Sequence, residues 1–187
     1  MSMFADIRTQ KALRQAEGYL DLIFALADRW PLSVANRERM ALRALEALES
    51  IPDEGRLRGT IQYMRGLAYR ALEAYPEAIP PLASAAELEP DNFHIYLALA
   101  WCYKRIGRLD LAIESLEDAE EIAPDEAIIQ FNLACYWCLA SNKKRTLFHL
   151  SRSFELDPDY REKVNEESDF DPLRRDPDFQ LLNSLIV

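Results

Sequence analysis

Apolar side chains recur along most of this chain at spacings of three and four positions, which is the period of an amphipathic α-helix. In residues 93–126 two such stretches are separated by a break at Gly107 and closed by Pro124. Glycine allows the chain to leave the helix, and proline stops the second helix because it has no N–H to donate. The alternation of period two that marks a half-buried strand is absent. The pattern therefore predicts an all-α fold built of helix pairs.

The same pattern occurs once before this stretch and once after it, in the same register. In each copy the first helix carries a small residue, which permits close helix approach, and an aromatic residue three positions on. The second helix carries a leucine and then a small residue on its inner face, and each copy ends in Pro-Asp, whose acid is predicted to cap the next helix. These positions are Gly66, Ala100 and Ala134; Tyr69, Tyr103 and Trp137; Leu82, Leu116 and Leu150; Ala85, Ala119 and Ser153; Pro90, Pro124 and Pro158; and Asp91, Asp125 and Asp159.

This period and residue pattern resemble the tetratricopeptide repeat. The copies occupy residues 59–92, 93–126 and 127–160, and the resemblance implies an all-α, right-handed superhelical solenoid of antiparallel helix pairs. The departures are local. They comprise glutamine where tryptophan is favoured, two replaced turn glycines, and two prolines early in a second helix that are expected to kink it or shift its start. The residues concerned are Gln62 and Gln130; Glu73 and Ser141; and Pro80 and Pro81.

The residues before the repeats are predicted to form a variant helical hairpin, residues 1–58, that covers one apolar end of the stack. Its helices are expected over about 5–29, ended by Trp30 and Pro31, and from Ser33 to about Ser50, closed by Pro52. The apolar stripes are Leu13, Ala16, Leu20, Ile23, Phe24 and Ala27 on the first helix, and Ala41, Ala44, Leu45 and Leu48 on the second.

The residues after the repeats, 161–187, are predicted to cap the other end. Their apolar side chains are expected to fold back over the last repeat; they are Phe170, Leu173, Phe179, Leu182 and Leu185. The run DFDPLRRDPDFQLL, with FNLACYW before it, resembles the ending of repeat arrays in many bacterial tetratricopeptide proteins. That resemblance implies a capping role and carries no activity with it.

Composition narrows the class of protein further. The hydrophobic fraction of 49% is ample for a core, no apolar run is long enough to span a membrane, and the N-terminus has no apolar signal region. Three cysteines fit a reducing cytoplasm rather than a disulfide scaffold. The net charge of −10 arises entirely from residues 81–187, since residues 1–80 carry 11 basic and 11 acidic side chains. Nucleic-acid binding would need a basic face, which the chain lacks, and no membrane attachment is expected.

Candidate binding residues follow from the resemblance, because the first helices of successive repeats line the concave groove of such a solenoid. This strip is aromatic and apolar with a few cations, a composition typical of protein-binding surfaces. The alternative is that the N-terminal helix or another copy of the chain fills the groove. A clamp for terminal carboxylates is not expected, since the polar residues it needs are scarce. The groove-facing residues are predicted to be Tyr63, Leu67, Arg70, His94, Leu97, Trp101, Arg105, Phe131, Cys135 and Cys138.

Catalytic and metal chemistry find little support in the sequence. The pair Cys135 and Cys138 falls inside a predicted helix, whereas a redox pair needs a helix N-terminus to lower the thiol pKa. Zinc needs two further ligands, and the spare candidates Cys102, His94 and His149 lack metal-site spacing. We therefore expect no metal, no cofactor and no catalytic site.

The sequence as a whole predicts a non-enzymatic adaptor of bacterial type, located in the cytoplasm, that binds a peptide or helix of a partner protein in its groove. Two alternatives stay open. One is a chaperone of secreted substrates similar to those of type III secretion, which are also acidic and built of about three such repeats. The other is a structural homo-oligomer whose groove is filled by a neighbouring copy.

Overall fold

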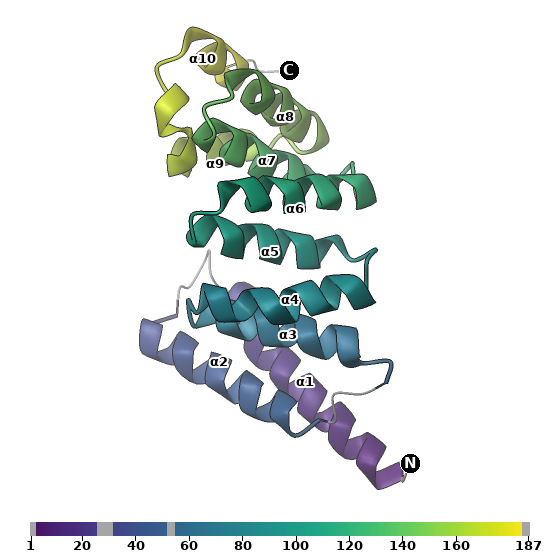
Figure 1. The fold of residues 1–187 in the computed structure, drawn as a ribbon. Coiled ribbons are helices and arrows are strands. Elements are labelled where there is room, and N and C mark those ends of the chain that lie inside the picture. The colour runs from purple at the N-terminus through teal and green to yellow at the C-terminus, as the bar shows by residue number, and fades with distance from the viewer. Residues whose placement is uncertain (1–2, 26–31, 52–54, 185–187) are drawn as a thin grey trace. The chain divides into compact units, whose positions relative to one another are not determined.

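The computed structural model describes residues 3–25, 32–51 and 55–184, and every regular element within those ranges is a helix (Figure 1). This confirms the all-α prediction. The chain forms two compact units, residues 1–106 (unit 1) and 107–187 (unit 2). None of the described helices is both long enough and apolar enough to cross a bilayer. The expectations for Ala27, Trp30, Pro31, Pro52 and Leu185 lie outside the described residues.

Unit 1 consists of helix pairs that pack side by side. The pairs are α1 with α2 and α3 with α4, and α5 packs on α4. Their bounds are α1 Met3–Ala25, α2 Val34–Glu49, α3 Arg58–Ala71, α4 Tyr75–Leu88 and α5 Phe93–Arg105. Ser33 caps α2, as its position before the apolar stripe predicts, since its hydroxyl accepts the Asn36 N–H at 3.3 Å.

The close approach of α3 and α4 depends on a glycine. A β-carbon added at Gly66 would lie 2.4 Å from Cγ of Leu82, so the missing side chain makes room for that leucine. Leu82 is fully buried and belongs to a core that includes Ala78, Ala85 and Ile95. The small residue of the repeat thus has the packing role that its position indicates.

Unit 2 continues the spacing of the repeats and then departs from it. The hairpin of α7 and α8 is its largest helix contact, and the C-terminal elements pack on these two helices. The bounds are α6 Leu109–Ile122, α7 Ala127–Leu139, α8 Lys143–Leu156, α9 Tyr160–Glu166, the 3-10 helix η1 Ser168–Leu173 and α10 Pro177–Ser184. Phe170 and Phe179 are buried against each other, with ring centres 5.5 Å apart, where the C-terminal segment folds back.

The turns between the two helices of the three regular repeats share one backbone conformation. Glu73, Gly107 and Ser141 occupy equivalent positions of successive repeats and have φ angles of 59°, 78° and 58°. This left-handed conformation is easy for glycine and costs other residues on the order of 1 kcal/mol. The replaced glycines therefore keep the geometry of the turn that glycine would give.

Two local predictions are corrected by the structure. The N-caps of α5 and α7 are Asn92 and Glu126 rather than the preceding aspartates, and Asp159, although it is the N-cap of α9, makes no side-chain capping bond. Asp125 instead accepts a hydrogen bond from Arg152 at 3.0 Å, so its carboxylate is turned to another helix. The prolines of the first repeat do not shift the start of α4, which begins at Tyr75, before both of them.

Unit 2 also buries a short polar network. Gln130 donates to Glu120 at 2.7 Å, and its carbonyl oxygen lies 2.9 Å from Nδ1 of His149, which must therefore carry the proton. His149 is buried, and burial lowers its pKa from the usual 6.5; the charges of Glu120 and Glu117 oppose this shift, and the charge of Arg145 adds to it. The network satisfies polar groups that would otherwise be costly to bury.

We expect the stability of the chain to fall as the pH drops below about 6.5. The unfolded chain then takes up a proton at His149 that the folded chain resists, so protonation favours unfolding. The check is the urea-unfolding free energy between pH 7.5 and 5.5 for wild type, His149→Gln and His94→Gln, where His94 is the exposed histidine. His149→Gln should flatten the slope; a slope that His149→Gln leaves unchanged would contradict the prediction.

Candidate functional site

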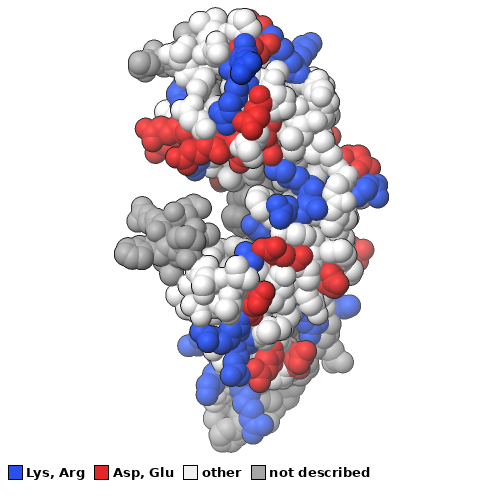
Figure 2. Space-filling view, turned by 90° about the vertical axis from the view of Figure 1, so that its left-hand side faces the viewer, with Lys and Arg blue, Asp and Glu red and all other residues white. Residues whose placement is uncertain are grey.

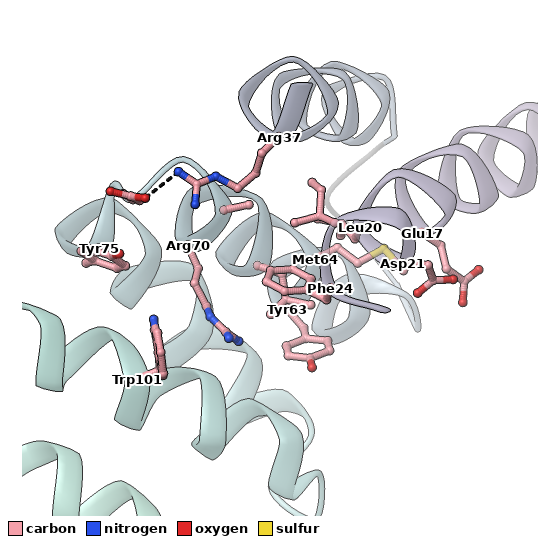
Figure 3. Close-up of a pocket in the computed structure, with 14 residues that line it drawn as sticks. Glu17, Leu20, Asp21, Phe24, Arg37, Tyr63, Met64, Arg70, Tyr75 and Trp101 are labelled. Carbon is pink, nitrogen blue, oxygen red and sulfur yellow. Dashed lines mark hydrogen bonds and ion pairs between the residues drawn. The ribbon is translucent and has the colours of Figure 1, made fainter. Parts of the chain in front are cut away.

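A pocket of about 760 Å³ opens within unit 1, between α1, α3 and the start of α4, with one residue of α5 at its edge (Figure 3). Its floor is the face of α3 that carries residues at i, i+4 and i+7 spacing, namely Tyr63, Leu67 and Arg70, with Met64 beside them. The volume falls in the range of ligand-binding clefts. The remaining lining residues are Glu17, Leu20, Asp21, Ile23 and Phe24 of α1, Arg37 of α2, and Ala71, Glu73, Tyr75 and Trp101.

Arg70 lies between two aromatic rings in this pocket. Its guanidinium carbon is 4.8 Å from the ring centre of Phe24 and 5.2 Å from that of Trp101. Arg70 extends from α3 toward Trp101 in the close-up (Figure 3). Such cation–π stacking stabilises each contact by about 0.5–2 kcal/mol. The arginine therefore links α1, α3 and α5 through side chains that also line the pocket.

Burial raises the pKa of two neighbouring groups, Tyr63 and Cys102, the latter to about 11, and the charge of Arg70 opposes both shifts. Cys102 is fully buried and neutral at physiological pH, so it offers no reactive thiolate. Tyr63 keeps its proton and can donate or accept a hydrogen bond. The pocket thus has aromatic and cationic groups but no activated nucleophile among its described lining residues.

The walls of the pocket differ in charge. Glu17 and Asp21 are exposed and lie together on the α1 side (Figure 3), whereas Arg37 on α2 is paired with Glu73 at 2.5 Å. Figure 2 shows Lys and Arg gathered on one part of unit 1, and a patch of Asp and Glu on unit 2. This distribution agrees with the sequence, in which the excess negative charge follows residue 80.

Comparison with known proteins identifies the fold family. A family model described as tetratricopeptide repeat matches residues 69–131, from the end of α3 into α7. This match supports the tetratricopeptide repeats that the sequence pattern predicts. Anaphase-promoting complex subunit 3 of Dictyostelium discoideum is 41% identical to this chain over 54 residues, which make up 29% of this chain and 6% of that subunit.

Solved structures share the tetratricopeptide-repeat fold at low sequence identity. YrrB, a tetratricopeptide-repeat protein with an unusual peptide-binding site, is 23% identical with a TM-score of 0.57, over 71% of this chain and 65% of its own. MamA MSR-1 is 22% identical with a TM-score of 0.58, over 85% of this chain and 99% of its own. At these identities the likeness concerns the fold alone.

The structure gathers four of the ten residues predicted for partner binding. Tyr63, Leu67, Arg70 and Trp101 line the pocket, and Trp101 remains 39% exposed. The other three predicted residues of unit 1 are not in its lining. His94 is exposed, Leu97 is half-buried, and Arg105 is exposed with its guanidinium 5.2 Å from the ring centre of Tyr75.

The predicted exposure of the three α7 residues is wrong. Phe131, Cys135 and Cys138 are 5%, 2% and 2% exposed. The reason is that the C-terminal segment lies on this face of α7, where Phe131 contacts Phe170 edge-on at 5.6 Å and Tyr160 at 4.9 Å between ring centres. A partner has no access to them in this structure.

The largest omission of the sequence analysis is the contribution of α1 to the pocket. Leu20, Ile23 and Phe24 were predicted on the apolar stripe of a hairpin that covers one end of the stack, and not as binding residues. The N-terminal helix was considered as a filler of the groove. The structure shows α1 forming a wall of the pocket and leaving its volume open.

Proposed function

We propose that this chain is a non-enzymatic adaptor that binds a segment of a partner protein in the unit 1 pocket. The observation that carries the proposal is Trp101, a large aromatic side chain 39% exposed at the edge of a pocket of about 760 Å³. Tryptophan, tyrosine and arginine are the residues that most often dominate the energy of protein interfaces, and Trp101, Tyr63 and Arg70 meet here.

The chemistry of the pocket indicates what the partner segment contains. Tyr63, Leu67 and Trp101 offer an apolar surface for an aliphatic or aromatic side chain. A basic residue of the partner beside that anchor would face the exposed Glu17 and Asp21 of α1. An adaptor role is also supported by the fold, because stacked helix pairs present extended binding surfaces and YrrB carries a peptide-binding site.

The test is selection of peptides from a displayed random library on the purified chain, followed by affinity measurement on variants. Trp101→Ala is expected to weaken binding of a selected peptide by about 30-fold or more, which corresponds to the loss of a hot spot of about 2 kcal/mol. Phe148→Ala is the matched control, since Phe148 is an aromatic residue of α8, 64% exposed and outside the pocket.

The outcomes separate the proposal from its alternatives. Equal weakening by both variants, or failure to select any peptide, would contradict binding in the pocket. A concentration-dependent dimer in sedimentation velocity that Trp101→Ala dissociates would favour the homo-oligomer. A chaperone of secreted substrates would instead stabilise an intact, aggregation-prone protein and would show no affinity for short peptides.

A further inference from the structure

Three metal-ligating side chains converge in unit 2, far along the sequence from the pocket. The Sγ atom of Cys135 and one carboxylate oxygen each of Glu167 and Asp169 all lie within 4.8 Å of one another. Cys135 belongs to α7, Glu167 lies between α9 and η1 as the N-cap of η1, and Asp169 is the second residue of η1. Cys135 and Asp169 are buried, with 2% and 8% exposure, and Glu167 is half-buried.

Packing around this cluster fixes the segments that carry it. Phe170, next to Asp169, is fully buried and contacts Phe131, which lies one turn before Cys135 on α7. The main-chain N–H of Asp169 donates to Oε1 of Glu167 at 3.1 Å, which turns the glutamate toward the start of η1. The donors are therefore brought together by the fold and not by chance meetings of flexible surface chains.

One sulfur and two carboxylate oxygens are ligand types that favour some metal ions over others. Zinc accepts thiolate sulfur at about 2.3 Å and carboxylate oxygen at about 2.0–2.2 Å, and sites with three protein ligands leave a fourth position for water. Magnesium and calcium prefer oxygen ligands throughout, and monovalent copper prefers sulfur. Two carboxylates and a thiolate would more than neutralise the charge of a divalent ion.

We propose that Cys135, Glu167 and Asp169 bind a zinc ion in this chain. Tetrahedral zinc with these bond lengths places its ligand atoms about 3.5 Å apart, so the three side chains need only small rotations from their present separation. The Cys135 thiol loses its proton on binding, because a coordinating thiol is deprotonated by the ion. Binding would join α7 to the C-terminal segment through coordination as well as through aromatic packing.

Cys138 stands beside the site and provides the control. It lies three positions after Cys135 on α7, yet its sulfur is not among the three converging donors. Burial, and after it the charge of Asp169, raise the pKa of Cys138 to about 11, and the Leu173 N–H bonds to it. Because its sulfur is outside the converging set, we assign Cys138 as a thiol that does not coordinate the ion.

The test is titration of the reduced chain with Co²⁺, which reports thiolate ligation through a near-ultraviolet charge-transfer band, followed by displacement with Zn²⁺. Wild type and Cys138→Ser should both show this band at one ion per chain and lose it to zinc. Cys135→Ser should lack the band, and Glu167→Gln should weaken binding at least tenfold. Zinc should also raise the melting temperature of wild type but not of Cys135→Ser.

Three results would overturn the proposal. The first is absence of a zinc-displaceable band in wild type. The second is a band that depends on Cys138 as much as on Cys135, and the third is a band that Glu167→Gln leaves unchanged. Circular dichroism of each metal-free variant separates loss of the site from loss of the fold, and Glu167→Gln changes a half-buried side chain by one atom.

Discussion

Replacing Phe170 by alanine is expected to lower the free energy of unfolding by about 3–5 kcal/mol, the cost typical of removing a buried phenylalanine. Phe170 is 0% exposed and its ring contacts those of Phe131 and Phe179. Without it the C-terminal segment loses its main apolar contact with α7. Urea denaturation followed by circular dichroism measures the loss, and faster labelling of Cys135 and Cys138 by a thiol reagent would report the uncovered helix.

The matched substitution is Phe148→Ala on the neighbouring helix α8. Phe148 is 64% exposed, so its removal should change stability by no more than about 0.5 kcal/mol. Similar losses for the two variants would mean that the C-terminal segment is held by something other than this aromatic contact.

Gly66→Ala is expected to destabilise the chain by about 1–3 kcal/mol, although alanine favours helices more than glycine does. The new β-carbon would lie 2.4 Å from Cγ of Leu82 and 3.3 Å from the carbonyl oxygen of Ala78. Because Leu82 is fully buried, it has no free volume into which to move. The expected result is a lower urea midpoint.

The same substitution at Gly18 should have the opposite sign. Gly18 lies inside α1, and a β-carbon there would meet nothing within 4 Å. Alanine should therefore stabilise the helix by about 0.5–1 kcal/mol. If both substitutions stabilise the chain, the contact between α3 and α4 is more adaptable than the structure indicates.

The helices were predictable because each rests on a local and repeated signal. The leucines of the second helices stand at equivalent positions of successive repeats, and all three are 0% exposed; they are Leu82, Leu116 and Leu150. The residues that cap the helices were harder to predict than the helices themselves. The aspartates after the prolines were predicted as caps from their residue type and position, but the chain enters α5 and α7 one position later, at Asn92 and Glu126.

The residues of the candidate site also differ in whether the sequence could place them. Tyr63 and Trp101 could be placed because their position within a repeat determines the face they occupy. The burial of Phe131 depends on Phe170, which lies in the C-terminal segment, beyond the repeats and outside their phase. This contact arises because a nonrepetitive segment folds back onto the repeats. Residue spacing in the sequence could not predict it.

The acidic partners of Cys135 were missed for a related reason. Zinc was weighed with cysteine and histidine as the only further ligands, whereas Glu167 and Asp169 are carboxylates in a segment with no recognised metal-binding pattern. The signal available in the sequence was the turn before Phe170, where η1 brings two acids next to an aromatic residue. The two acids become candidate metal ligands only because η1 packs on α7, which carries Cys135.

The three left-handed turns have a consequence for anyone who wishes to build longer arrays from this chain. Residues 93–126 carry Gly107 at the turn, whereas the flanking repeats hold Glu73 and Ser141 in a conformation that side chains resist. The middle repeat is therefore the natural template for concatenation, because each added copy would enter its second helix without backbone strain. Copies of either neighbour would add that strain once per repeat, and the penalty would grow in proportion to the length of the array.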